Sequence, residues 1–134
     1  MEEPSRQQEP PFRRVLVIED DPVLSRILAR NLARRGVEVQ VAASAEAALD
    51  LLSAWQPDLL VLDLELPGRT GWEVVRQLRA SGRQIPVVIV TGGPLPMRRI
   101  AEFQPLAVLR KPFPLEAFLR LVQGDREGEE SSEF

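Results

Sequence analysis

Acidic, hydroxyl and amino side chains follow apolar segments of this sequence, where they could bind a cation and a phosphoryl group. Glu19 and Asp20 follow one apolar run, Asp63 follows a second, and Thr91 follows a third. Lys111 is the only lysine in a chain with sixteen arginines. Because a planar guanidinium replaces a compact ammonium poorly, we interpret Lys111 as a functional residue.

Carboxylates gathered in one place need a positive counter-charge to remain ionised together. Mg²⁺ supplies that charge with one or two direct carboxylate ligands; we predict Asp20 and Asp63 as ligands and Glu19 as a contact through water. An aspartate can also attack phosphorus and form an aspartyl-phosphate. The cation and the Lys111 ammonium would neutralise the phosphoryl oxygens, and the Thr91 hydroxyl would donate to one of them.

Each of these residues has an ordinary structural explanation when it is considered alone. Asp63 would be a loop residue, Thr91 a turn residue and Lys111 a solvated charge. Asp21 is explained by a helix cap, and Glu73 by a capping box. Only the joint placement of the polar residues at one edge of a sheet favours a functional site.

Composition excludes several classes of function. The chain has no cysteine and no histidine, so a metal must be held by oxygen atoms. The net charge of −3, with both signs mixed, argues against nucleic acid or an anionic membrane as a direct partner. No apolar run is long enough to span a bilayer, and the N-terminus lacks the pattern of a signal peptide. We therefore predict a cytoplasmic protein.

The chain divides into three predicted segments. Residues 1–12 are polar with three prolines and are predicted to form a disordered arm, and residues 124–134 a disordered acidic tail. Residues 13–123 are predicted to form one domain. Within it, the continuous apolar runs are typical of strands buried on both faces of a parallel sheet: 15–18, 59–62 and 87–90. The alternating segment 37–41 and the short segment 106–109 are predicted to be the two edges.

Helix signals separate these strands. Asp21 caps the first helix, whose predicted apolar face comprises Leu24, Ile27, Leu28 and Leu32. Ser44 caps the second, and residues 70–73 form a capping box before the third. Prolines leave only 97–104, about two turns, for the fourth helix, and Pro114 opens the last.

Alternation of strands and helices implies right-handed crossovers with helices on both faces. The predicted fold is therefore α/β: a five-stranded parallel sheet of order 2-1-3-4-5, flavodoxin-like and doubly wound. Sites in such sheets form beyond the carboxyl ends of the central strands. All the polar residues singled out above fall at that edge.

With these motifs in place, the chain resembles the chemotaxis-regulator-like receiver domains of two-component response regulators. The resemblance covers nearly all of the segment 13–123. The motifs that carry it are Val-Ile-Glu-Asp-Asp-Pro at 17–22, Pro-Asp-Leu-Leu-Val-Leu-Asp-Leu-Glu-Leu-Pro-Gly at 57–68, Val-Thr-Gly at 90–92 and Arg-Lys-Pro-Phe at 110–113.

The resemblance implies roles for individual residues. Asp63 would be the phosphoacceptor, and Asp20, Asp63 and the backbone carbonyl of Glu65 would bind Mg²⁺ with help from Glu19. Lys111 and Thr91 would then sense the phosphate. The peptide bond between Lys111 and Pro112 is expected to be cis.

The resemblance also implies partners. A histidine kinase or a phosphotransfer protein would donate the phosphoryl group, and a downstream protein, an attached output domain or a second copy of the chain would read the result. The chain would be a signalling switch rather than an enzyme, assisting only its own phosphorylation and dephosphorylation.

Three residues depart from the pattern of the family. Val108 stands three positions before Lys111, where receivers usually carry an aromatic residue. Thr70 stands where an aspartate is frequent. Glu65 adds a negative charge two residues after the proposed acceptor and could tune the lifetime of the phosphate.

Other functions were weighed. A phosphorylation-independent interaction module with the same fold is favoured by Val108 and the short fourth helix, and disfavoured by the complete acidic site. A phosphohydrolase is disfavoured because Glu65 replaces its usual second aspartate and no cap domain is present. A nucleotide-binding protein is disfavoured because no glycine-rich loop follows the first strand.

Overall fold

Five strands alternate with five helices in the computed structural model, which describes residues 12–66 and 70–123. The strands are β1 (Arg14–Ile18), β2 (Glu38–Ala42), β3 (Leu59–Asp63), β4 (Val87–Thr91) and β5 (Ala107–Arg110). The helices are α2 (Pro22–Arg34), α3 (Ala45–Leu52), α4 (Gly71–Ala80), α5 (Met97–Phe103) and α6 (Leu115–Gln123). The predicted arm (up to residue 11) and the predicted tail (124–134) lie outside the described residues.

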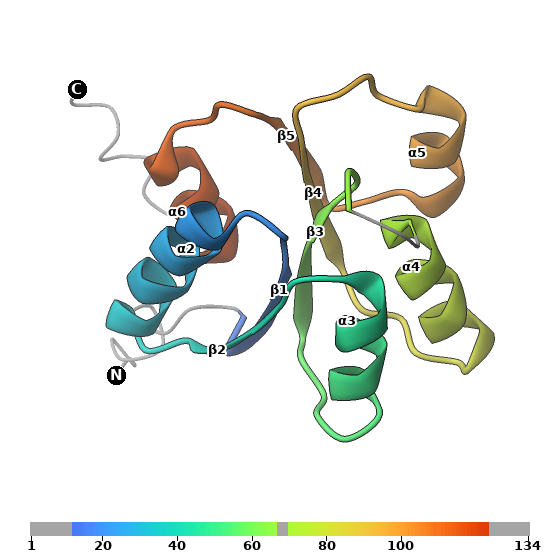
Figure 1. Cartoon of the computed structure of the whole chain (residues 1–134), viewed down its shortest axis with the longest axis horizontal. Coiled ribbons are helices and arrows are strands. Elements are labelled where there is room, and N and C mark those ends of the chain that lie inside the picture. The colour runs from blue at the N-terminus through green and yellow to red at the C-terminus, as the bar shows by residue number, and fades with distance from the viewer. Residues whose placement is uncertain (1–11, 67–69, 124–134) are drawn as a thin grey trace, which may run out of the picture.

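All the strands pair in parallel, in the order β2-β1-β3-β4-β5, which confirms the predicted fold (Figure 1). The register places Ile18 beside Leu62, and Asp63 beside Val90. Thr91 pairs with Arg110 in the same way. The ends of the three central strands and of β5 therefore meet at one edge, as the alternation of elements predicts.

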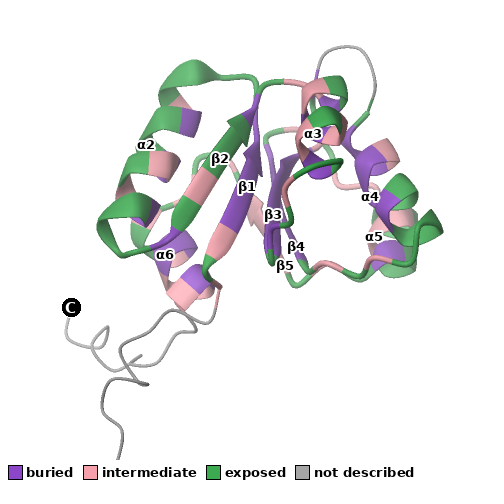
Figure 2. Cartoon of the chain, turned by 90° about the horizontal axis from the view of Figure 1, so that it is seen from below, coloured by how far each residue is buried: buried purple, intermediate pink, exposed green. Residues whose placement is uncertain are grey.

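Helices cover both faces of the sheet, and each face has its own apolar core (Figure 2). α3, α4 and α5 pack on one face through residues that include Ala48, Val74 and Phe103. α2 and α6 pack on the other through Leu28, Leu32, Phe118 and Val122. Because β1, β3 and β4 are buried on both faces, their continuous apolar sequences are explained.

Two helix caps behave as predicted and one does not. The Asp21 carboxylate accepts hydrogen bonds from the backbone N–H groups of Val23 and Leu24, and the Ser44 hydroxyl from that of Ala47. Thr70 is the N-cap residue of α4, but its side chain makes no cap hydrogen bond. The predicted capping box therefore marks the start of the helix, but the Thr70 side chain does not make its expected contact.

The apolar pattern predicted too much burial at one position of α2. Ile27, assigned to the inner face of α2, is 43% exposed, while Ser25 is buried in its place. Val41 of β2 is 40% exposed, which fits the predicted place of this half-exposed strand at the edge of the sheet. Among the described residues, no helix combines the length and the apolar character that a membrane crossing requires.

α5 is the short helix that the prolines predict, with seven residues, and its end is held by tertiary contacts. The Phe103 ring stacks on Trp72 of α4 with centroids 5.0 Å apart. Arg79 of α4 lies over the same ring and donates from Nη2 to the Phe103 carbonyl at 2.6 Å. The helix then ends at Gln104, which adopts a left-handed conformation with φ 50°.

Candidate functional site

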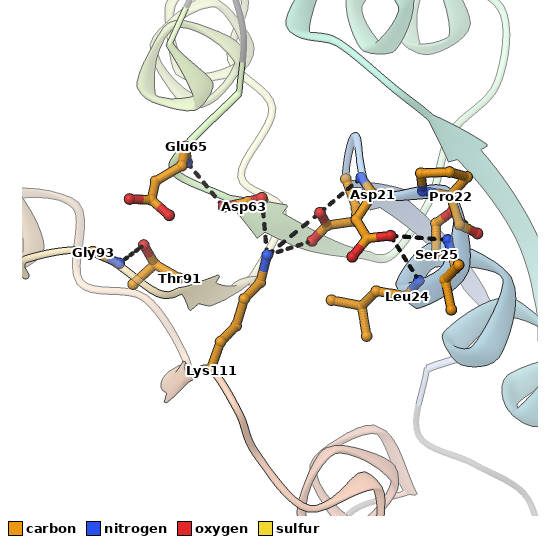
Figure 3. A network of polar contacts seen from close by, with 11 residues as sticks. Asp21, Pro22, Leu24, Ser25, Asp63, Glu65, Thr91, Gly93 and Lys111 are labelled. Carbon is orange, nitrogen blue, oxygen red and sulfur yellow. Dashed lines mark hydrogen bonds and ion pairs between the residues drawn. The ribbon is translucent and has the colours of Figure 1, made fainter.

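Lys111 joins two carboxylates that come from different strands (Figure 3). Its Nζ lies 3.2 Å from Asp63 Oδ2 and 3.1 Å from Glu19 Oε1. Glu19 and Asp63 are each only 1% exposed, whereas the Lys111 side chain is 25% exposed. An ammonium at the mouth of the site therefore compensates buried negative charge from the ends of β1 and β3.

Backbone N–H groups fix the orientation of both carboxylates. Asp21 N donates to Glu19 Oε2 at 3.0 Å, in the turn that leads into α2. Glu65 N donates to Asp63 Oδ1 at 2.9 Å, in the turn that follows β3. Each carboxylate therefore has one oxygen held by its own loop, while Lys111 approaches both of them.

The backbone connects Thr91 with Lys111. Lys111 N donates to the Thr91 carbonyl at 2.9 Å, directly after the last paired residues of β4 and β5. Thr91 is 1% exposed, and its hydroxyl accepts a hydrogen bond from Gly93 N at 3.3 Å. The peptide bond between Lys111 and Pro112 is cis, as predicted.

The pKa values of both Glu19 and Lys111 are raised. A raised pKa favours the neutral form of Glu19 but the charged form of Lys111. Burial is the main cause that raises the pKa of the Glu19 carboxyl above its ordinary 4.5, and the nearby Asp63 charge acts in the same direction. Burial alone would lower the pKa of Lys111, but its bonds to Glu19 and Asp63 outweigh burial and raise it above 10.5. Lys111 is therefore fully charged at neutral pH.

The three carboxylates Glu19, Asp20 and Asp63 could hold a metal ion. Each offers an oxygen, and these oxygens lie within 4.8 Å of one another. Glu19 Oε1 is buried and accepts no hydrogen bond from the described residues, although Lys111 Nζ lies close to it. A buried oxygen with spare acceptor capacity and an all-oxygen donor set fit a hard divalent cation such as Mg²⁺.

The structure brings together most of the residues predicted for the site. The side chains of Glu19, Asp20, Asp63 and Lys111 converge, and Thr91 joins them through its backbone contact with Lys111. For Glu65, the contact seen is the one from its N–H to Asp63, whereas the prediction concerned its carbonyl. The roles of these residues in phosphoryl transfer stay predictions.

Sequence reasoning missed residues that shape the site through the backbone. A β-carbon at Gly71 would lie 2.7 Å from Leu62 Cδ1 and 3.0 Å from the Asp63 carbonyl, so a side chain here would require Leu62 and the end of β3 to shift. Arg110 Nη1 donates to the Gly93 carbonyl at 3.1 Å and so holds the loop after β4. The only sequence signal for Gly71 was its place directly after Thr70, which the capping box already explained.

Val108, the departure from the aromatic pattern, is half-buried on the inner face of β5. It packs against the core formed with α3, α4 and α5. A valine at this position fills part of the core and has no ring that could swing between an inner and an outer position.

Comparison with known proteins agrees with this architecture. A family model described as the response regulator receiver domain matches residues 15–123. Response regulator MprA of Mycolicibacterium vanbaalenii is 38% identical over 108 residues, which are 79% of this chain and 47% of MprA. The chain thus spans about half the length of the curated relatives it matches.

Solved structures that contain ligands show the same fold. A response regulator from Burkholderia pseudomallei with a phosphorylated aspartic acid, a calcium ion and citrate is 26% identical, with a TM-score of 0.72 over 90% of this chain and 72% of that chain. TrrA of Thermotoga maritima in complex with Mg²⁺ and BeF is 25% identical, with a TM-score of 0.73 over 84% of this chain and 97% of TrrA. By sequence, fold and acidic site, this chain belongs to the family of response regulator receiver domains.

Proposed function

We propose that the chain is a phosphorylation switch in which Asp63 accepts a phosphoryl group from a phosphohistidine on a kinase or phosphotransfer protein. The observation that carries the proposal is the contact of the Lys111 ammonium with Asp63 Oδ2 beside two further carboxylates. Receiver domains are signalling switches in general rather than enzymes. Similar proteins whose structures hold a phosphorylated aspartic acid, or Mg²⁺ with BeF, support the proposal.

In the proposed reaction, a carboxylate oxygen of Asp63 attacks phosphorus. A P–O bond forms, the P–N bond to the donor histidine breaks, and the imidazole leaves with the electron pair of that bond. Mg²⁺, held by Asp20, Asp63 and the Glu65 carbonyl and contacted through water by Glu19, would supply positive charge to the phosphoryl oxygens. Lys111 would balance the charge that reaches Asp63, and the Thr91 hydroxyl would donate to the new phosphoryl group.

The proposed signal is a change in the loops after β4 and β5. Lys111 now bonds Glu19 and Asp63, and the Thr91 hydroxyl accepts from Gly93 N. A phosphoryl group at Asp63 would compete for the ammonium and the hydroxyl and would therefore shift both loops. A downstream protein, an attached output domain or a second copy of the chain would read this change, and we place the process in the cytoplasm.

Intact mass spectrometry tests the proposal directly. The protein is incubated with Mg²⁺ and acetyl phosphate, which is a small acyl phosphate. We expect one phosphoryl adduct that needs Mg²⁺ and is absent from Asp63→Asn. Asp58→Asn serves as the matched control, because Asp58 bonds the backbone N–H groups of Arg13 and Arg14 at the start of β1, away from the site. An adduct that persists in Asp63→Asn would contradict the assignment.

One observation favours a second candidate, a phosphorylation-independent interaction module. Val108 has no ring to couple the site to the surface, so binding of a partner could be insensitive to phosphate. Normal Mg²⁺ binding without any phosphoryl adduct, from acetyl phosphate or from a phosphorylated donor protein, is the result that this candidate predicts.

A further inference from the structure

The outer side of α2 carries a row of arginines that the proposed reaction does not use. Arg26, Arg30 and Arg34 are exposed and recur at every fourth position, so they line one side of the helix over about 12 Å. α2 contains no acidic residue, and the exposed Arg35 follows at its C-cap. Within residues 12–66 and 70–123, no carboxylate forms an ion pair with any of these arginines. This arginine row is therefore a concentration of positive charge with no described counter-charge.

The arginine row begins beside the point where the described chain ends. α2 and α6 pack next to each other on one face of the sheet, and each returns from the carboxyl end of a parallel strand, so the two helices point the same way (Figure 1). Arg35 Nε donates to Gln123 Oε1 at 3.2 Å, which joins the C-terminal ends of both helices. The chain that follows Gln123 therefore starts at the Arg34 end of the row.

The next segment of the chain has the opposite charge. Residues 125–130 read Asp-Arg-Glu-Gly-Glu-Glu, with four carboxylates and a single arginine. They include no aliphatic or aromatic side chain, so charge is the main attraction open to them. An extended chain advances about 3.3 Å per residue, so this segment is long enough to follow the whole arginine row.

We propose that the arginine row of α2 is a docking surface for an extended acidic segment, and that residues 125–130 of this chain occupy it. The segment would run from Arg34 toward Arg26, antiparallel to the helix. Exposed ion pairs are weak one by one, but several of them act together here. The covalent link to α6 also keeps the effective concentration of the segment high.

The same side of α2 exposes apolar side chains. Val23 and Ile27 are 60% and 43% exposed. Val23 precedes Arg26, and Ile27 precedes Arg30, by three positions, so both lie on the side of the arginine row. A protein partner that binds these side chains would have to displace the acidic segment. The proposed docking thus covers this surface without depending on phosphoryl transfer.

A nitroxide label in the full chain tests the docking by nuclear magnetic resonance. The chain has no cysteine, so Ser131→Cys provides one attachment site directly after the segment. At low ionic strength, we expect the label to broaden the backbone amide signals around Arg26, at the far end of the row. The signals of α4, on the opposite face of the sheet, should stay sharp. Broadening around Arg26 should be lost at high salt, because exposed charges are screened.

Charge variants identify the two sides of the contact. Arg30→Gln with Arg34→Gln should remove the broadening around Arg26, and so should the replacement of all four carboxylates of 125–130 by amides. Arg98→Gln with Arg99→Gln serves as the matched control, because it removes the same charge from α5 on the other face of the sheet. This control should leave the broadening as it is.

Broadening around Arg26 that persists at high salt, or after either set of substitutions, would overturn the proposal because it would not arise from ionic docking. Absence of broadening around Arg26 in the labelled, otherwise unaltered chain would overturn it too, and would leave the arginine row to another anionic partner such as a nucleic acid. Dispersed amide signals from β1 and β3 in every variant confirm that the fold is intact.

Discussion

A single ammonium group holds the acidic residues of the site together in the absence of a metal. Lys111 Nζ bonds carboxylates at the ends of β1 and β3, both of which are buried. A buried carboxylate that loses its partner retains the cost of its desolvation. The metal-free protein therefore depends on Lys111 for stability as well as for the proposed chemistry.

The first prediction concerns Lys111→Met. Without Mg²⁺ at pH 7, we expect the free energy of unfolding to fall by about 1–3 kcal/mol, because two buried carboxylates lose their counter-charge. Mg²⁺ should bind more tightly than to the unaltered protein, because a competing cation is gone. Urea unfolding with and without Mg²⁺ measures both quantities. Arg26→Met, at an exposed position of α2, controls for the loss of one positive charge, and an equal loss of stability there would contradict the prediction.

The second prediction concerns pH and Glu19. Because the folded state raises the pKa of Glu19 above 4.5, protonated Glu19 stabilises the fold, and this contribution is lost as pH rises through the raised value. The measured quantity is the free energy of unfolding of the unaltered metal-free protein minus that of Glu19→Gln. This difference should therefore decrease as the pH rises from below 4.5 to neutral. Urea unfolding across this range, with a chelator present, measures the difference. An increase with pH would show that the fold favours the ionised form.

At the scale of elements, α5 shows how tertiary contacts stabilise a helix that its own sequence supports weakly. Seven residues bracketed by prolines are too few for a stable isolated helix. The Trp72 ring and the Arg79 guanidinium hold its C-terminal end through Phe103. The N-terminal end instead continues into the loop after Thr91. The contacts that hold α5 therefore lie mainly at its C-terminal end.

The third prediction concerns the end of α5. Gln104 adopts a left-handed conformation, with its N–H bonded to the Ile100 carbonyl, and a side chain in this conformation costs about 1 kcal/mol relative to glycine. Gln104→Gly should therefore raise the free energy of unfolding by about 1 kcal/mol. Gln77→Gly, within right-handed α4, should lower it by a similar amount. Thermal and urea unfolding of both variants measures the signs, and a loss of stability at residue 104 would contradict the assigned strain.

At the scale of the whole molecule, the sequence was sufficient to predict the strand order and the edge where the polar residues meet. Apolar runs reveal buried strands, and a parallel α/β topology then places every strand end on a known side. The burial of single residues on helices was harder to predict. The apolar stripe of α2 includes Ile27, but the extent of the surface that α2 covers depends on how it lies against β1, β2 and α6, and local sequence does not determine that packing.

The details of the site depended on contacts that no local pattern reveals. The direction of the Glu65 carboxylate follows from the empty space at Gly93, and the role of Arg110 follows from the path of the loop after β4. Both arise only when segments more than fifteen residues apart are folded side by side. Residue types therefore predicted which groups meet, and three-dimensional packing determined how they face one another.

The close contact at Gly71 has a consequence for any variant library built from this chain. Any other amino acid would bring its β-carbon close to Leu62 Cδ1 and to the Asp63 carbonyl, so these neighbours would have to shift. Screens that vary α4 should therefore treat position 71 separately from the exposed positions of the helix.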